Sequence, residues 1–115
     1  MALTVTTWDD VTSALAALPD QDPIELWSPP AAAEVQGVLW FAALQRSLAA
    51  QFPTRRATIV LDCGDRADLA IDALRAGLAS VALAANEDLG RKVGEIAAQF
   101  GGRLYLRAPE SAPLH

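Results

Sequence analysis

A short polar segment after the most strongly predicted strand is the first candidate for chemistry. Ala57-Thr-Ile-Val-Leu-Asp62 is a continuous apolar run that ends in an acid, and Cys63, Gly64 and Asp65 come directly after it. A carboxylate at the end of a buried strand can hold a metal, accept a phosphoryl group or bind a ribose hydroxyl. It can equally accept backbone N–H groups in a tight turn. We expect the turn role for Asp62 and keep the ligand role as the alternative.

Cys63 has the position of a nucleophile near a helix N-terminus, where a thiolate is stabilised. The chain offers it no base, because the only histidine is His115 in the tail. A Cys-x5-Arg loop would also need an arginine at position 69, which is occupied by Leu69. We therefore expect Cys63 to be a small buried residue.

Two further polar residues follow other predicted strands. In open α/β sheets, ligands bind beyond the carboxyl ends of the strands, which share one edge. If the domain binds a small ligand, the binding residues predicted by this rule are Ser28, Asp62, Cys63, Asp65 and Asn86. The chain has no glycine-rich phosphate loop, no zinc spacing and no Ser–His–acid triad free of the terminal histidine. The sequence thus predicts no catalytic residue, no metal site and no cofactor.

The elements that would position these residues alternate between strand and helix. Apolar periodicity and capping residues predict strands at 1–5, 24–27, 57–62, 80–84 and 103–107, and helices at 7–18, 31–52, 66–76 and 87–100. Thr7 with Asp10, Asp65 and Asn86 are the predicted helix N-caps. This alternation at βαβ spacing predicts a parallel sheet with right-handed crossovers.

The predicted fold is an α/β domain. The apolar run at 57–62 is typical of a central strand covered on both faces. We expect a single three-layer domain over residues 1–107, with a mostly parallel sheet of four or five strands, flavodoxin-like or Rossmann-like. Residues 108–115 are expected to form a loose tail. A half-barrel that pairs with a second copy is the alternative.

Two families share a short pattern with the strand that ends at Asp62. It resembles the phosphoacceptor strand of response-regulator receiver domains, and Thr58-Ile-Val-Leu-Asp62 also resembles the central strand of STAS domains. Receiver domains further need an acidic pair after the first strand and a lysine after the last, whereas Val5 is followed by two threonines and Lys92 lies inside a helix. STAS domains carry a serine or threonine after the strand, and residues 66–78 contain neither. Neither resemblance implies a function here.

Composition excludes several classes of partner. The 9 basic and 14 acidic residues give a net charge of -5, which argues against nucleic acid and anionic membrane surfaces. No apolar run reaches the ~18 residues of a membrane span. The N-terminus lacks the basic region of a secretory signal and Cys63 is the only cysteine, so we expect a cytoplasmic protein. Eight arginines against one lysine, with abundant alanine, indicate a GC-rich bacterial genome.

Two features point to association with another protein. Six acidic residues precede the first basic residue, Arg46, which indicates a solvated acidic edge or, alternatively, a docking face for a basic partner. In the predicted helix at 31–52, Leu39 and Trp40 fall among polar residues and should be partly exposed in a monomer. Gly37 would let two backbones approach closely. We predict an interface at Gly37, Leu39 and Trp40.

The function favoured by these observations is a small non-enzymatic α/β module that self-associates, as a homodimer, or docks on another protein. The alternative is a small-molecule-binding or enzymatic domain with its site around Asp62. The support for the alternative is location in the fold alone.

Overall fold

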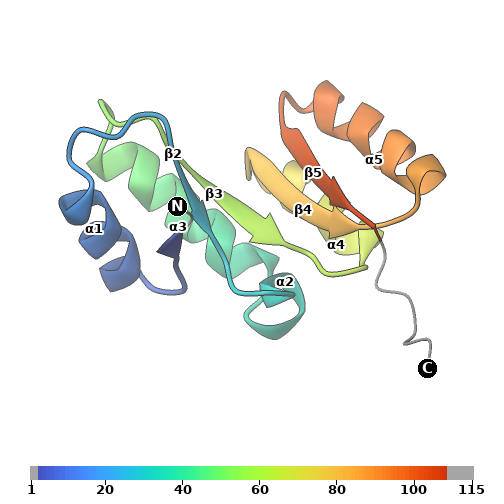
Figure 1. Cartoon of the computed structure of the whole chain (residues 1–115), viewed down its shortest axis with the longest axis horizontal. Helices are drawn as coiled ribbons and strands as arrows, with labels where there is room; N and C mark the ends of the chain where they lie inside the picture. The colour runs from blue at the N-terminus through green and yellow to red at the C-terminus, as the bar shows by residue number, and fades with distance from the viewer. Residues whose placement is uncertain (1–2, 109–115) are drawn as a thin grey trace.

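Five parallel strands form one sheet in the same order as they occur in the sequence (Figure 1). The computed structural model describes residues 3–108, so most of the predicted tail at 108–115 lies outside the described residues. The elements are β1 (Leu3–Thr4), α1 (Trp8–Ala17), β2 (Ile24–Trp27), α2 (Ala32–Val35), α3 (Val38–Gln51), β3 (Ala57–Asp62), α4 (Ala67–Arg75), β4 (Ser80–Ala84), α5 (Glu87–Gln99) and β5 (Arg103–Arg107). The predicted α/β class, with helices packed on a parallel sheet, is confirmed.

The strand order identifies the kind of winding. Flavodoxin-like sheets run 2-1-3-4-5 and Rossmann-like sheets 3-2-1-4-5-6, whereas this sheet runs β1-β2-β3-β4-β5. Right-handed crossovers between consecutive neighbouring strands place their helices on the same face of a sheet. Accordingly, α4 packs against both α3 and α5. The predicted mostly parallel sheet is therefore present, but its strand order is that of neither a flavodoxin-like nor a Rossmann-like sheet.

The core lies between this row of helices and the sheet. Alternate strand residues point to one face, and on the helix side these are Leu26, Ile59, Leu61, Val81 and Leu83, all fully buried. They pack with Phe41 and Leu48 of α3, Leu74 of α4 and Val93 of α5. Burying one large aliphatic or aromatic side chain stabilises a fold by about 1.5–3 kcal/mol, so this layer supplies most of the hydrophobic stabilisation.

The other face of the sheet is concave and carries polar and aromatic side chains. The rings of Trp27 in β2 and Tyr105 in β5 lie 5.3 Å apart between centroids, although β3 and β4 separate their strands. Only a strongly curved sheet brings them together. Val60 in β3 is fully buried on this face, because side chains that reach across the concave surface cover it. The prediction of a central strand is confirmed, since β3 is the middle strand of the five. The prediction of full burial holds only in part, because Thr58 is half-buried on the concave face.

The long helix predicted at 31–52 is wrong as one element. It is divided into α2 and α3 at Gly37, which has φ +95° and ψ 153°. This backbone conformation is accessible almost only to glycine. The break is not visible in the sequence pattern, because apolar residues at helical spacing occur on both sides of it: Ala33 is buried in α2, and Phe41 and Leu44 are buried in α3.

Two of the three predicted helix N-caps are confirmed. Thr7 and Asp10 form a complete capping box, and Asn86 accepts a hydrogen bond from the Leu89 N–H at 2.9 Å. Asp65 is not an N-cap: Arg66 has that position, without a side-chain cap. Asp65 lies instead inside the turn that precedes α4: Gly64 in this turn has φ +59°, and the Arg66 N–H closes it by donating to the Cys63 carbonyl oxygen at 3.0 Å. Over residues 3–108, no helix has the length and apolar character needed to cross a membrane.

Candidate functional site

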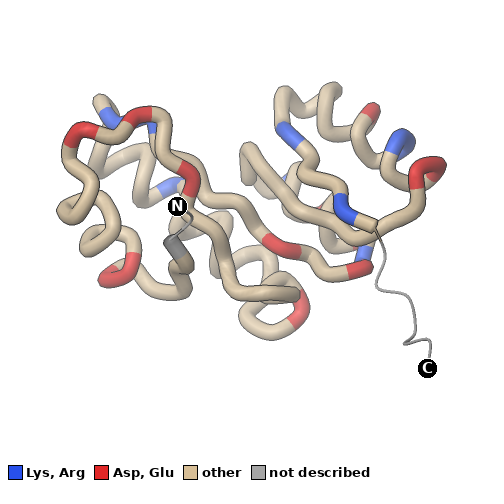
Figure 2. Tube along the Cα trace, in the orientation of Figure 1, with Lys and Arg blue, Asp and Glu red and all other residues tan. Residues whose placement is uncertain are grey.

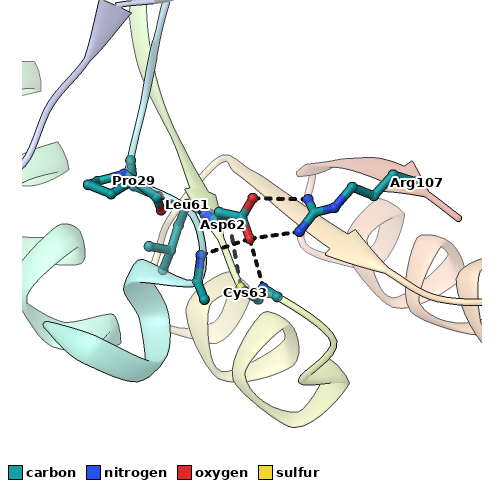
Figure 3. A network of polar contacts seen from close by, with 8 residues as sticks. Pro29, Leu61, Asp62, Cys63 and Arg107 are labelled. Atoms are coloured by element: carbon teal, nitrogen blue, oxygen red, sulfur yellow. Dashed lines mark hydrogen bonds and ion pairs between the residues drawn. The ribbon is translucent and has the colours of Figure 1, made fainter. Parts of the chain in front are cut away.

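Asp62 is the centre of a polar network at the carboxyl ends of the strands (Figure 3). Its Oδ1 accepts the backbone N–H groups of Gly64 at 2.8 Å and Ala31 at 3.2 Å. Arg107, at the end of β5, donates to Oδ2 at 2.9 Å and to Oδ1 at 3.2 Å. The Asp62 N–H in turn donates to the Ser28 hydroxyl at 2.9 Å. The carboxylate thus ties the ends of β2, β3 and β5 together.

The electrostatics of Asp62 follow from these contacts. Burial alone would raise the pKa of this carboxyl, because it disfavours the charged form. The hydrogen bonds from Arg107, Gly64 and Ala31 outweigh burial, and the pKa lies below its usual value. Both oxygens are already engaged by donors inside the protein. Asp62 therefore accepts backbone N–H groups in a turn, as expected, and it also forms an ion pair with Arg107.

Cys63 is fully buried and its thiol donates to the Leu61 carbonyl oxygen at 3.7 Å. Burial, reinforced by the negative charge of Asp62, raises the pKa of Cys63 to about 12. The thiol is therefore protonated at neutral pH, whereas a nucleophilic cysteine needs a lowered pKa. This environment belongs to a packing residue.

Of the remaining predicted ligand residues, Ser28 belongs to the Asp62 network, whereas Asp65 and Asn86 lie apart from it. Ser28 is buried and its hydroxyl donates to the Pro29 carbonyl oxygen while accepting from Asp62. Asp65 is exposed on the turn before α4, and Asn86 is engaged as the cap of α5. Within the described part of the chain, no group of three or more His, Cys, Asp or Glu side chains could hold a metal ion. Of the five residues, a hydrogen bond joins only Ser28 and Asp62, and Cys63 is linked to them only as the next residue in the chain.

The concave face contains a cavity that the sequence analysis missed. It has a volume of about 790 Å³ and lies at the amino ends of β2, β3, β4 and β5. Its lining combines two aromatic rings, an acid, a base and two hydroxyl groups, supplied by Trp27, Tyr105, Glu25, Arg103, Thr58 and Ser80. Small-molecule sites commonly occupy about 300–1,000 Å³, so the cavity has the size of a ligand site.

Three of these side chains form a chain of polar contacts across the cavity. The Tyr105 hydroxyl contacts the Glu25 carboxylate, and Arg103 donates to the same hydroxyl at 3.2 Å. The Arg103 guanidinium is also 4.0 Å from Glu25 and stands over the Tyr105 ring, 5.9 Å from its centroid. The hydrogen bond to Tyr105 is the main reason that the pKa of Arg103 lies above its usual value. The two charges on the cavity wall offset each other.

The sequence carried a signal for this cavity. Ile24-Glu-Leu-Trp27 and Arg103-Leu-Tyr-Leu-Arg107 alternate between aliphatic and polar or aromatic residues. Such period-two alternation indicates a strand with two unlike faces. The rule that ligands bind at the carboxyl ends of strands directed attention to the opposite edge of the sheet.

The predicted interface residues lie on an apolar surface around the break between α2 and α3. Val35 is 77% exposed, Leu39 76% and Trp40 47%; we call these three residues the α2–α3 patch. The predicted exposure of Leu39 and Trp40 is confirmed. The Trp40 indole N–H donates to the Thr6 carbonyl oxygen at 2.7 Å, which fixes the ring while leaving half of it accessible. Gly37 beside them has open space around its Cα, so within the chain it serves the backbone turn rather than close packing.

The early acidic residues share their end of the molecule with basic residues. Figure 2 shows acidic and basic positions interspersed over both ends of the molecule. Three of the six early acids lie beside arginines from later in the chain: Asp22 pairs with Arg55, Glu34 with Arg66 and Glu25 with Arg103. Folding thereby neutralises half of the charge asymmetry seen in the sequence, which weakens the case for a basic partner.

Comparison with known proteins does not extend this account. A scan of protein-family models finds no match to the sequence, and a search of curated proteins finds no similar chain. The candidate functional surfaces of the molecule are the α2–α3 patch and the concave cavity.

Proposed function

We infer that this protein is a non-enzymatic interaction module whose α2–α3 patch docks on a second copy of the chain. The observation that carries this proposal is the cluster of exposed apolar side chains within six residues, two of them more than three-quarters exposed. Exposed apolar residues scattered singly need no explanation, whereas contiguous ones mark interaction sites. The alternative function, a small-molecule site around Asp62, has less support, because Asp62 is paired with Arg107 and the Cys63 thiol is buried.

Trp40 has the properties of an interface anchor. Residues that dominate binding energies are enriched in tryptophan, and a ring that is already fixed loses little entropy on binding. The hydrogen bond from Trp40 to Thr6 holds the indole in place before any partner arrives. Leu39 and Val35 supply flanking apolar area of the kind that excludes water around such an anchor.

The charges at the edge of the patch favour a second copy over a strongly charged partner. Glu34, which precedes Val35 in the chain, pairs with Arg66 at 3.3 Å. Both signs of charge are therefore present at one margin, so two copies related by a two-fold axis can each meet an opposite charge. A rim of one sign would repel its own copy. The proposal places the module in the cytoplasm, because its buried free thiol needs no oxidising compartment.

Light scattering on matched variants tests this proposal. Leu39 and Leu89 each lie in the first turn of a long helix, α3 and α5 respectively, and both are exposed. Leu39→Glu should convert a dimer into a monomer at high micromolar concentration, because it buries a charge at the centre of the contact. Leu89→Glu should leave the mass unchanged.

The outcome can go against the proposal in two ways. A wild-type chain that is monomeric at high micromolar concentration would reject self-association through any surface. A dimer that survives both Leu39→Glu and Trp40→Glu, with native circular dichroism, would show that a different surface holds the two copies together.

A further inference from the structure

The concave cavity is a second surface that the docking proposal does not use. It lies at the amino ends of four strands, while the α2–α3 patch follows the carboxyl end of β2. Its wall contains titratable and aromatic groups from β2 and β5 that meet across β3 and β4. Neither the hydrophobic core nor the Asp62 network requires these contacts. These groups are therefore available to recognise a ligand.

The charge balance of the cavity selects against charged ligands. Glu25 and Arg103 are 4.0 Å apart and both contact the Tyr105 hydroxyl. A bound anion would face the Glu25 carboxylate, and a bound cation would face the Arg103 guanidinium. Because the opposite charge lies 4.0 Å away on the same wall, a ligand of either sign gains less attraction here than it would beside an unpaired charge. An uncharged ligand can instead accept hydrogen bonds from the guanidinium and donate to the carboxylate at once.

The aromatic groups select a ligand with one apolar face. Trp27 and Tyr105 are tilted by 49° and do not form parallel walls, so no slot is available for a flat ring inserted between them. Arg103 stands over the tyrosine ring, which leaves the Trp27 indole as the aromatic surface open to a ligand, beside the aliphatic side chains of Pro23 and Ile24. Thr58 and Ser80 add hydroxyl groups, each able to donate and accept.

We propose that the concave cavity binds an uncharged cyclic polyol, such as a monosaccharide. The C–H face of the sugar ring would lie on the Trp27 indole. Its hydroxyl groups would exchange hydrogen bonds with Glu25, Arg103 and Ser80. The wall has a feature that suits each part of such a ligand: paired opposite charges, one accessible aromatic surface, and hydrogen-bond donors beside acceptors.

A chemical-shift titration of the ¹⁵N-labelled protein tests the proposal, because each of the three tryptophans gives its own indole signal. The probes are D-glucose and myo-inositol, and the comparators are glucose 6-phosphate, glucosamine and uracil. Glucose or inositol should shift the Trp27 indole signal with a Kd in the millimolar range, while the Trp40 signal holds. The phosphorylated, amino and planar comparators should bind roughly tenfold more weakly, a difference of about 1.4 kcal/mol.

Two variants examine the wall itself. Ser80→Ala removes one hydroxyl from the cavity and should weaken glucose binding severalfold, whereas Ser47→Ala on the exposed surface of α3 should not. Glu25→Gln keeps an acceptor for Tyr105 but leaves Arg103 without its carboxylate. This variant should gain affinity for glucose 6-phosphate, a change of preference that a merely destabilised protein would not show.

Three results would overturn the proposal. The first is no movement of the Trp27 signal with either polyol at 50 mM, which lies far above the expected millimolar Kd. The second is tighter binding of any comparator than of both polyols. The third is an unchanged preference in Glu25→Gln when its spectrum shows a folded protein. Wild-type self-association through the α2–α3 patch is independent of each of these outcomes.

Discussion

Replacing Asp62 by asparagine tests whether the carboxyl-edge network is structural. Asparagine keeps an oxygen for the N–H groups of Gly64 and Ala31, so those two contacts survive. It loses the charge that faces Arg107 and places an amide donor against the guanidinium. A charge-assisted hydrogen bond contributes about 1.5–3 kcal/mol. The Arg107 side chain is 43% exposed against 9% for Asp62, and solvent screening reduces the pair to about 1–2 kcal/mol.

The unmatched amide donor adds a second cost. A buried polar group without a partner costs about 1 kcal/mol or more, so we expect Asp62→Asn to lower the free energy of unfolding by roughly 2–3 kcal/mol in total. For a domain of this length, that corresponds to a fall in Tm of about 8–12 °C. Urea unfolding followed by circular dichroism measures the change. Asp88→Asn is the matched control, since Asp88 forms an exposed ion pair with Arg91 that should contribute less than about 1 kcal/mol.

A double-mutant cycle with Arg107→Gln separates the ion pair from the backbone contacts. If the pair carries the effect, the two substitutions together should cost at least about 1 kcal/mol less than the sum of the single ones. A loss below about 0.5 kcal/mol in Asp62→Asn would refute the reasoning. The reasoning would also be refuted if Asp62→Asn lowered the free energy of unfolding equally in the wild type and in the Arg107→Gln variant.

The same contacts make further predictions. The pKa of Asp62 is lowered in the folded state, so the stability that its charge contributes is present above the unfolded pKa of about 3.9 and is lost as the pH falls through the folded pKa. The stability of the wild type should therefore fall more steeply below about pH 4 than that of Asp62→Asn. Identical acid-unfolding profiles would contradict the lowered pKa. Cys63 should react with a thiol reagent at neutral pH only as fast as the protein opens, since burial raises its pKa to about 12, and rapid stoichiometric labelling of the native state would argue against this environment. Gly37→Ala should cost about 1–3 kcal/mol through backbone strain alone, whereas an unchanged urea midpoint would mean that the α2–α3 turn can relax.

The sequence predicted the elements well because their signals are local. Thr7, Asp10 and Asn86 act as caps through neighbours three residues away, and the apolar run of β3 needs no knowledge of its partners. The break at Gly37 was missed because helical spacing continues through it. A glycine in a helical pattern does not reveal its own φ.

The site could be predicted only in part, because its contacts are distant in sequence. Arg107 is 45 residues from Asp62, and Tyr105 is 80 residues from Glu25. The first pairing needs β5 to lie near the end of β3, and the second needs a sheet curved enough for β2 to meet β5. Strand order and curvature are set by how helices pack on the sheet, which periodicity along the chain does not encode.

A dilution series of ¹⁵N spectra tests the central claim, that the chain associates with itself through the α2–α3 patch. Spectra would be recorded from millimolar to low micromolar concentration, and the rotational correlation time would give the mass at each point. At the highest concentration, we predict the rotational correlation time of a dimer. On dilution, the Trp40 indole and Leu39 amide signals should shift, while the Trp27 indole signal should stay in place. A monomer at every concentration would contradict the claim, as would dilution shifts confined to Trp27 and β5.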